Sequence, residues 1–333
     1  MSNIDLIIKE EINIEELRNK IINGYNITKE EAMQLVEAPL DNLCFLANRI
    51  RKHFCSNVFD MCSIINAKSG KCSENCKFCA QSSHYDTKCD EYDILNKEEI
   101  LEQGKSDFDK GVLRYSIVTS GRALYGKEID EVYNAIETLN KETDGYVCAS
   151  LGLLDEEGFK KMKGAGLRRV HNNLEASRNF FPNVCTTHSY DDKIKAIKAA
   201  QKAGMVVCSG GIMGMGETWE DRIDMALELR DLGIMSIPVN MLNPIASTPF
   251  ENIKPLTEDD MKRIVAIYRF INPKAFIRLA GGRGLLKDKG RACFLSGANA
   301  AITGDMLTTA GISIETDKKM AEDLGYKIIL TED

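Results

Sequence analysis

The fold is decided by the run Met61-Cys62-Ser63-Ile64-Ile65-Asn66 and by the stretch that follows it, Lys71-Cys72-Ser73-Glu74-Asn75-Cys76-Lys77-Phe78-Cys79. The first is strand-like, and the second places three thiols at C-x3-C-x2-C spacing. A zinc site or a four-thiolate cluster would need a fourth cysteine at a regular offset, but the next one, Cys89, follows a polar loop. Three thiolates on a four-iron cubane leave one iron open to bind a further molecule. A zinc knuckle and a buried group of thiols are the alternatives.

Composition places the chain among ordinary globular proteins. Its 333 residues are 44% apolar and 28% charged, which is enough apolar material for a large α/β domain. The net charge of −7 argues against a nucleic-acid binder, which needs a basic surface. Neither a secretory signal nor an apolar run of membrane-spanning length is present. The chain has 11 cysteines, which indicate a reducing compartment, so we expect a soluble, cytoplasmic protein that binds no membrane.

The first part of the chain is predicted to be helical. Asn13 and Glu16 form a capping pair before Ile14–Ile22, and Thr28-x-x-Glu31 is a capping box before Ala32–Val36. A third amphipathic stretch covers Asp41–Phe54. We therefore expect an N-terminal helical extension over residues 1–56, in which the two cysteines, Cys44 and Cys55, serve as small apolar side chains.

From Met61 onward, short apolar strands alternate with amphipathic helices, which is typical of parallel βαβ units. The pattern predicts a closed (β/α)8 TIM-type barrel over residues 57–333, with a doubly wound open sheet as the alternative. The expected strands are Met61–Asn66, Leu113–Thr119, Tyr146–Ser150, Arg168–Asn173, Met205–Ser209, Ser236–Leu242, Ala275–Leu279 and Ala300–Thr303. The expected helices are Lys97–Lys110, Ile129–Glu142, Glu156–Ala165, Tyr190–Ala203, Trp219–Leu232, Glu258–Phe270, Lys289–Phe294 and Lys318–Leu324.

Several of these strands carry side chains that a plain core does not need. Cys62, Cys148 and Cys208 lie within strands, and Arg278 interrupts the apolar strand Phe276-Ile277-Arg278-Leu279. A single strand cysteine is usually a core residue. A buried arginine without a counter-charge is costly, however, and thiolates facing the same interior would supply one. Together these residues predict a second iron–sulfur cluster inside the barrel.

The motifs identify a family. With Phe78 just before the last cysteine, the C-x3-C-x2-C segment resembles the radical S-adenosylmethionine (SAM) superfamily, and the region from Met61 to about Thr309 resembles biotin synthase. The matching segments, in chain order, are Lys68–Ser82, Cys148–Gly152, Asn172–Glu175, Val207–Ile212, Gly214–Thr218, Pro238–Leu242, Arg278–Leu279, Gly297–Asn299 and Leu307–Thr309.

The resemblance implies a reaction in which sulfur is inserted between two unactivated carbons of dethiobiotin to give biotin. A [4Fe-4S] cluster would bind SAM and cleave it to a 5'-deoxyadenosyl radical, which takes hydrogen from the substrate. An auxiliary cluster, [2Fe-2S] in the family, would donate the sulfur. The resemblance also implies a homodimer and a flavodoxin or ferredoxin-type electron donor.

Residue roles on the SAM side follow from matching positions. Cys72, Cys76 and Cys79 would hold the [4Fe-4S] cluster, with Phe78 near the adenine. Gly210, Gly211 and the segment from Gly214 to Glu217 match the glycine-rich region near the methionine part of SAM, although a plain turn is the alternative. Asn173 and Glu175 match ribose and substrate contacts. Lys193 either meets the SAM carboxylate or is a solvated helix charge.

On the substrate side, Asn240 matches a contact to the ureido ring, and Thr308 and Thr309 match groups near the carboxylate. His171 stands where the family commonly has an asparagine that faces the substrate. It is expected to retune the pocket or to lie against it.

One departure concerns the auxiliary cluster. The family places a cysteine on the second barrel strand, where this chain has Ser116, and serine is a poor ligand for iron compared with a thiolate. Cys62 lies on the neighbouring strand and would face the same interior. We therefore predict that Cys62, Cys148 and Cys208, with Arg278, hold the auxiliary cluster. The sequence leaves open whether this cluster has the two irons that are typical of the family.

Three further cysteines have no role in this prediction. Cys89, Cys185 and Cys293 are expected to be incidental, although Cys185 lies where an extra ligand or a thiol for cluster repair would fit.

Another radical SAM enzyme, such as a hydrogenase-maturation protein or an amino-acid mutase, is the main rival function. An iron–sulfur carrier and a zinc enzyme are rivals from other classes.

Overall fold

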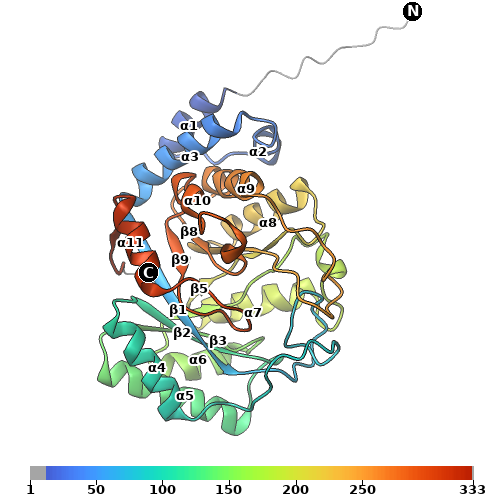
Figure 1. Cartoon of the computed structure of the whole chain (residues 1–333), viewed down its shortest axis with the longest axis vertical. Helices are drawn as coiled ribbons and strands as arrows, with labels where there is room; N and C mark the ends of the chain where they lie inside the picture. The colour runs from blue at the N-terminus through green and yellow to red at the C-terminus, as the bar shows by residue number, and fades with distance from the viewer. Residues whose placement is uncertain (1–12, 332–333) are drawn as a thin grey trace, which may run out of the picture.

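The fold is organised around one closed parallel sheet (Figure 1). The computed structural model describes residues 13–331, and the parts of the two predicted regions at 1–12 and 332–333 lie outside them. The last strand of the sheet pairs with the first, so the predicted TIM-type barrel is confirmed and the open doubly wound sheet is wrong. In order of pairing, the barrel strands are β1 (Val58–Lys68), β2 (Arg114–Thr119), β3 (Tyr146–Ser150), β4 (Arg169–His171), β5 (Val206–Cys208), β7 (Ser236–Met241), β8 (Phe276–Leu279) and β9 (Ala300–Ile302).

The fifth barrel strand is broken in its middle. After β5 the chain passes Ser209 and Gly210 and re-enters the sheet as β6 (Gly211–Met213), which pairs with β7. A Cβ atom on Gly210 would lie 1.9 Å from the carbonyl oxygen of Pro238, so a larger residue does not fit there. The sequence analysis missed β6 and also β10 (Lys327–Ile328), which pairs with the start of β1. Both are too short to show a period of their own.

Helices surround the barrel, and several of them begin at side-chain caps. Asn96 with Glu99, Ser189 with Asp192, and Thr218 with Asp221 each form a capping box, which satisfies the first free N–H groups of a helix. No helix within residues 13–331 is both long and apolar enough to cross a lipid bilayer. The helices after β1 are α4 (Lys97–Asp109), α5 (Gly126–Glu142), α6 (Glu156–Gly164), α7 (Tyr190–Lys202), α8 (Trp219–Asp231), α9 (Glu258–Ile271), α10 (Arg291–Leu295) and α11 (Ile314–Asp323), with short 3-10 helices η1 (Phe181–Asn183) and η2 (Arg283–Leu285).

The N-terminal helices are α1 (Ile14–Ile22), α2 (Lys29–Gln34) and α3 (Leu40–Cys55) (Figure 1). Helix α3 packs against α9 and carries α1, while α2 packs against α8 and α9. The predicted caps at Asn13 and Thr28 are both present. Arg263 of α9 donates to the carbonyl oxygen of Ala38 over 2.7 Å, which ties the extension to the barrel. Apolar side chains of the extension belong to the same core as those of the barrel. The division into regions 1–56 and 57–333 therefore stays a prediction.

One buried ion pair holds the end of the chain to the barrel. Arg283 of η2 makes two hydrogen bonds to the Asp317 carboxylate of α11, at 2.8 and 2.6 Å, and both side chains are almost fully buried. Because the pair is shielded from water, each charge depends on the other.

Asp317→Asn should destabilise the fold by roughly 3–5 kcal/mol, because the Arg283 guanidinium would stay buried without its carboxylate. Urea unfolding of the full chain measures this. The matched control is Asp130→Asn, which breaks an exposed pair with Lys161 and should cost less than about 1 kcal/mol. Equal losses in the two variants would contradict the assignment.

Candidate active site

The C-x3-C-x2-C segment forms a loop that follows β1. Cys72, Cys76 and Cys79 are free and half-buried. Backbone hydrogen bonds close the loop, from Cys72 to Gln81 over 3.0 Å and from Cys79 to Cys76 over 3.0 Å. Burial and, to a smaller extent, the nearby Cys72 raise the pKa of Cys79 to about 11, against the lowering effect of a backbone hydrogen bond at Gln81. The loop thus gathers three soft ligands at one place with partial access to solvent, which fits three irons of a [4Fe-4S] cluster.

The residues predicted to contact SAM meet beside this loop. The segment at Glu175 pairs with the glycines after β5: Glu175 N–H donates to the Gly210 oxygen over 3.0 Å, and Ile212 N–H donates to the Glu175 oxygen over 2.9 Å. A Cβ atom on Gly211 would lie 2.6 Å from that Glu175 oxygen. The glycines therefore allow a backbone contact that any larger residue would block.

Charges at this place favour a polar ligand. Burial raises the pKa of Glu175, while the Lys193 charge and a hydrogen bond from Asn173 oppose the rise. The Lys193 charge also lowers the pKa of Cys76, so Lys193 lies within electrostatic reach of both the cysteine loop and Glu175. The structure therefore brings Asn173, Glu175 and Lys193 together next to Cys76, although their roles toward SAM stay predictions.

Glu217 has a structural task that the sequence analysis missed. Its carboxylate accepts hydrogen bonds from the N–H groups of Gly214 and Met215, both over 2.7 Å, and from Arg222 Nε over 2.6 Å. Glu217 thereby fixes the Gly214–Glu217 turn. The signal in the sequence was a carboxylate placed within reach of two preceding backbone N–H groups. A direct contact to SAM stays a prediction.

A pocket opens between the cysteine loop and the ends of the later strands. Asn240 at the end of β7 donates to the Gly211 oxygen over 3.1 Å and accepts from Gly281 N–H over 2.9 Å. Asn66 of β1 donates to the Leu307 oxygen over 3.1 Å and so holds the segment with Thr308 and Thr309, a role that the sequence analysis missed. Among the lining residues are Phe78, Cys79, Ile212, Asn240, Thr308 and Thr309. Phe78 and the three predicted substrate contacts Asn240, Thr308 and Thr309 therefore share one pocket.

The predicted auxiliary ligands meet inside the barrel. Cys62, Cys148, Cys208 and Arg278 come from β1, β3, β5 and β8, which alternate around the closed sheet, and all four are buried. In TIM-type barrels, alternate strands supply the side chains of one interior layer. Burial raises the pKa of Cys62, with a further rise from Cys148, and Arg278 acts against it. Cys148 and Arg278 can affect the pKa of Cys62 from other strands because these side chains point into the same interior.

A charged group lies around these thiols. Asp60 accepts from Arg114 Nε and from Arg278, each over 2.8 Å. Burial alone would raise the pKa of Asp60, but the guanidiniums of Arg278, Arg114 and Arg169 hold it far below its ordinary value. The sequence analysis missed Asp60, Arg114 and Arg169, whose signal was a charge inside an otherwise apolar strand. Three buried guanidiniums therefore lie around one carboxylate, next to the thiols.

Two residues that depart from the family lie in the same interior. Ser116 of β2 pairs in register with Cys148, and His171 of β4 pairs with Cys208. Burial raises the pKa of Cys148, but a hydrogen bond and the charge of His171, together with Arg169, bring it below its ordinary value. His171 thus lies beside Cys148 in the interior, and its predicted contact to substrate remains a prediction.

The interior has polar atoms that fit an auxiliary cluster. Within residues 13–331, Arg278 Nε, Ser116 Oγ and His171 Nε2 are buried without a hydrogen-bond partner. Unpaired polar atoms are rare in cores and costly. Their position around the three thiols fits an iron–sulfur group whose sulfides accept such donors.

Comparisons with known proteins agree with this geometry. The model of the Radical SAM superfamily matches residues 67–229, and the Biotin and Thiamin Synthesis associated domain matches residues 238–327. The crystal structure of methylornithine synthase (PylB) superposes with a TM-score of 0.83 at 20% identity, covering 94% of this chain and 97% of that one. The [FeFe]-hydrogenase maturase HydG superposes with a TM-score of 0.80 at 19% identity, covering 94% and 74%. These two likenesses show the fold, and with the matched models they define a radical SAM enzyme on a TIM-type barrel.

The sequence relatives are more specific. The biotin synthase of Brachyspira hyodysenteriae is 89% identical over 333 residues and covers 100% of both chains. The biotin synthase of Akkermansia muciniphila is 52% identical over 312 residues and covers 94% of this chain and 97% of its own. This chain therefore belongs to the biotin synthase family, and membership implies a [4Fe-4S] cluster with SAM. A hydrogenase-maturation protein or an amino-acid mutase is not favoured.

Gly210→Ala should lower SAM cleavage by about 100-fold, because the added methyl group displaces the broken strand by the order of 1 Å beside the predicted SAM position. Reductive cleavage of SAM by the cluster-loaded full chain measures this, with circular dichroism to verify folding. The control is Gly164→Ala at the end of α6, where a Cβ atom meets nothing within 4 Å. Unchanged cleavage in a folded Gly210→Ala chain would contradict the close approach.

Proposed function

We propose that the chain inserts sulfur into dethiobiotin to form biotin. The carrying observation is that a buried group of three thiols and an arginine lies in the same barrel as a pocket bordered by the cysteine loop. A SAM-cleaving loop alone would suit many reactions. A second set of buried soft ligands suits a reaction that takes sulfur from an auxiliary cluster, as the names of the sequence relatives imply.

On the SAM side, Cys72, Cys76 and Cys79 would hold the [4Fe-4S] cluster. When bound, that cluster supplies the electron that cleaves SAM to the hydrogen-abstracting radical. Glu175 and Asn173 would bind the SAM ribose through their polar side chains, and Lys193 would offset the SAM carboxylate. Phe78 would cover the adenine, because it lies on the pocket wall next to Cys79.

On the substrate side, Asn240 would orient the ureido ring. Its amide is held by Gly211 and Gly281 but keeps one free N–H and one free lone pair for a ligand. Thr308 and Thr309 would bind the carboxylate at the other end of the pocket. The apolar lining, with Ile212 and Ile302 among it, excludes water from a reaction at unactivated carbons.

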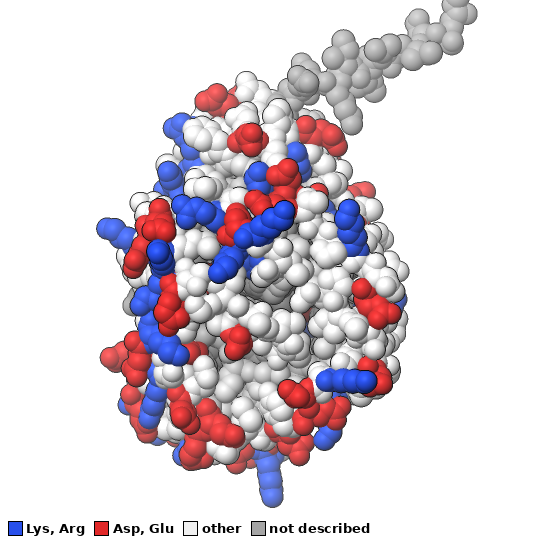
Figure 2. Space-filling model, viewed as in Figure 1, with Lys and Arg blue, Asp and Glu red and all other residues white. Residues whose placement is uncertain are grey.

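Below the pocket, Cys62, Cys148, Cys208 and Arg278 would hold the auxiliary cluster. Cys62 supplies the thiolate that Ser116 lacks, and His171 stabilises the thiolate of Cys148 by a hydrogen bond. The cluster's iron count, two in the family, is left to measurement. A cytoplasmic homodimer and a flavodoxin or ferredoxin-type electron donor complete the proposal. On the face shown in Figure 2, acidic and basic side chains are interspersed, so no patch of one sign there selects a donor.

An anaerobic single-turnover assay tests the reaction. The cluster-loaded chain is mixed with SAM, dithionite and dethiobiotin, and we expect biotin with roughly two 5'-deoxyadenosines per product. 5'-Deoxyadenosine without biotin would move the chain to another radical SAM substrate. An absence of SAM cleavage in a chain with intact clusters would overturn the assignment of the cysteine loop.

Cys62→Ala should remove the auxiliary iron and sulfide and abolish biotin formation, because a thiolate ligand is lost. SAM cleavage should remain. Iron and sulfide analysis with Mössbauer spectroscopy measures both clusters. The matched control is Cys44→Ala, which removes another buried thiol, on α3, and should leave both clusters in place. Unchanged auxiliary iron in Cys62→Ala would refute its role as a ligand.

A further inference from the structure

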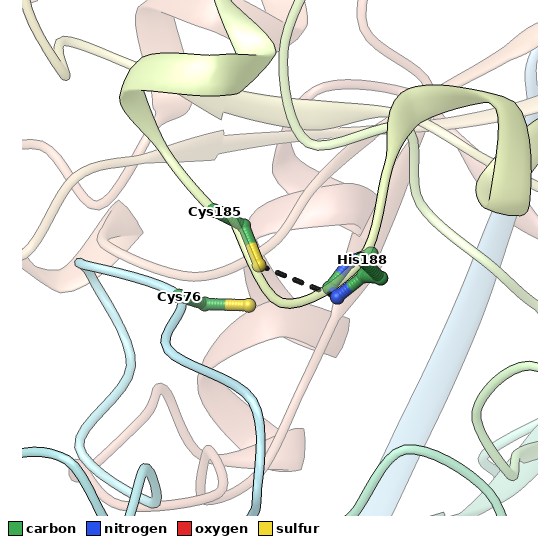
Figure 3. A group of neighbouring side chains, drawn as sticks. All are labelled: Cys76, Cys185 and His188. Atoms are coloured by element: carbon green, nitrogen blue, oxygen red, sulfur yellow. Dashed lines mark hydrogen bonds between the residues drawn. The ribbon is translucent and has the colours of Figure 1, made fainter.

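A cysteine that the proposed reaction does not use lies against the cysteine loop. Cys185 follows η1, and His188 follows it just before α7. In Figure 3 the side chains of Cys76, Cys185 and His188 point toward one another from two separate segments. Lys77 N–H donates to the Val184 oxygen over 2.9 Å, and the Asn75 side-chain oxygen accepts from Thr186 N–H over 2.9 Å. Backbone contacts therefore hold the two segments in register.

The three side chains have the spacing of ligands to one ion. One ligand atom from each side chain lies within 4.8 Å of those of the other two. Among residues 13–331, these are the histidine, cysteine and acidic side chains that meet this spacing as a group of three. Cys185 and His188 are buried, at 2% and 8% exposure, while Cys76 is half-buried. Cys185 Sγ lies 3.3 Å from His188 Nδ1. Two sulfurs and an imidazole at such distances suit a divalent first-row metal, with further positions open to other ligands.

The ring of His188 is held in place beside the two thiols. His188 Nδ1 lies 2.5 Å from Glu74 Oε2, and Nε2 is buried without a partner in the described part of the chain. Glu74 is itself fixed by the Thr187 hydroxyl over 2.8 Å and by Arg122 over 3.4 Å. Because Nδ1 is the ring nitrogen that faces Cys185 Sγ, a metal ion bound with Cys185 takes the place of the Glu74 contact at that nitrogen.

We propose that Cys76, Cys185 and His188 bind a single ferrous ion while the cysteine loop holds no cluster. The site shares Cys76 with the [4Fe-4S] cluster of the proposed function, on which this inference rests. Iron bound at this site therefore lies beside the place where the cluster is built. The iron dissociates from Cys185 and His188 once Cys76 becomes a ligand of the cluster. Binding releases the protons of the thiols and involves no change in oxidation state. Zn²⁺ prefers the same ligands and should compete for the site.

Co²⁺ titration of the cluster-free full chain tests the site, because thiolate-to-cobalt and d–d absorption report the ligands. Cys72 and Cys79 are first removed as Cys72→Ser/Cys79→Ser, so that the loop's own thiols cannot bind the probe together. We expect this variant to bind one Co²⁺ with tetrahedral sulfur–nitrogen bands. Adding Cys185→Ser or His188→Gln should weaken binding by at least about 10-fold. Adding Cys44→Ser, a buried thiol on α3, should change nothing.

Two outcomes would overturn the inference: no Co²⁺ binding after loss of Cys72 and Cys79, or equal binding with and without Cys185. A second measurement uses Cys185→Ser alone with limiting Fe²⁺ and sulfide. Its initial rate of cluster formation should fall by about 10-fold while the final iron content is reached more slowly but in full. An unchanged rate would also overturn it. SAM cleavage by the fully loaded wild-type chain reports separately on the proposed function.

Discussion

The interior of the barrel depends on one buried carboxylate. Asp60 joins Arg114 of β2 to Arg278 of β8, and all three side chains are excluded from water. Arg169 also lies near enough to lower the pKa of Asp60, and buried charges of this kind are costly unless they are paired, because the dielectric constant there is low. Although burial raises the pKa of Cys148, His171 and Arg169 bring it below its ordinary value, so a thiolate is favoured at Cys148 beside these charges. A barrel filled by branched apolar side chains would contain neither these buried charges nor the thiols.

Above this interior, backbone geometry rather than side-chain charge shapes the SAM side. The break between β5 and β6 lets Gly210 and Gly211 lie against Pro238 and Glu175, where a Cβ atom would collide with backbone oxygens. Glu217 then fixes the next turn through two backbone N–H groups. Rigid scaffolding of this kind holds polar groups in place before a ligand arrives, which lowers the cost of ordering them on binding.

The cysteine loop is held chiefly by another loop. Asn75, Glu74 and Lys77 bond to the segment that ends at His188, and the His188 ring packs edge-on against Phe181 of η1 at 5.5 Å between centroids. A loop anchored in this way keeps its thiols near their working positions without burying them in the core. The same contacts bring Cys185 to Cys76, which links the positioning of the loop with the capture of iron.

The sequence by itself determined the barrel, because most of its strands and helices show a local period or a local cap, as at Thr28 and at Tyr146–Ser150. It also singled out the three-cysteine loop, whose ligands lie within eight residues. The tertiary structure alone decided what depends on closure: that Asp60, Arg114 and Arg169 meet around the thiols, that Asn66 holds Leu307, and that Cys185 faces Cys76. These partners are far apart in the chain, and no periodicity within a single element encodes which distant side chains a closed barrel brings together.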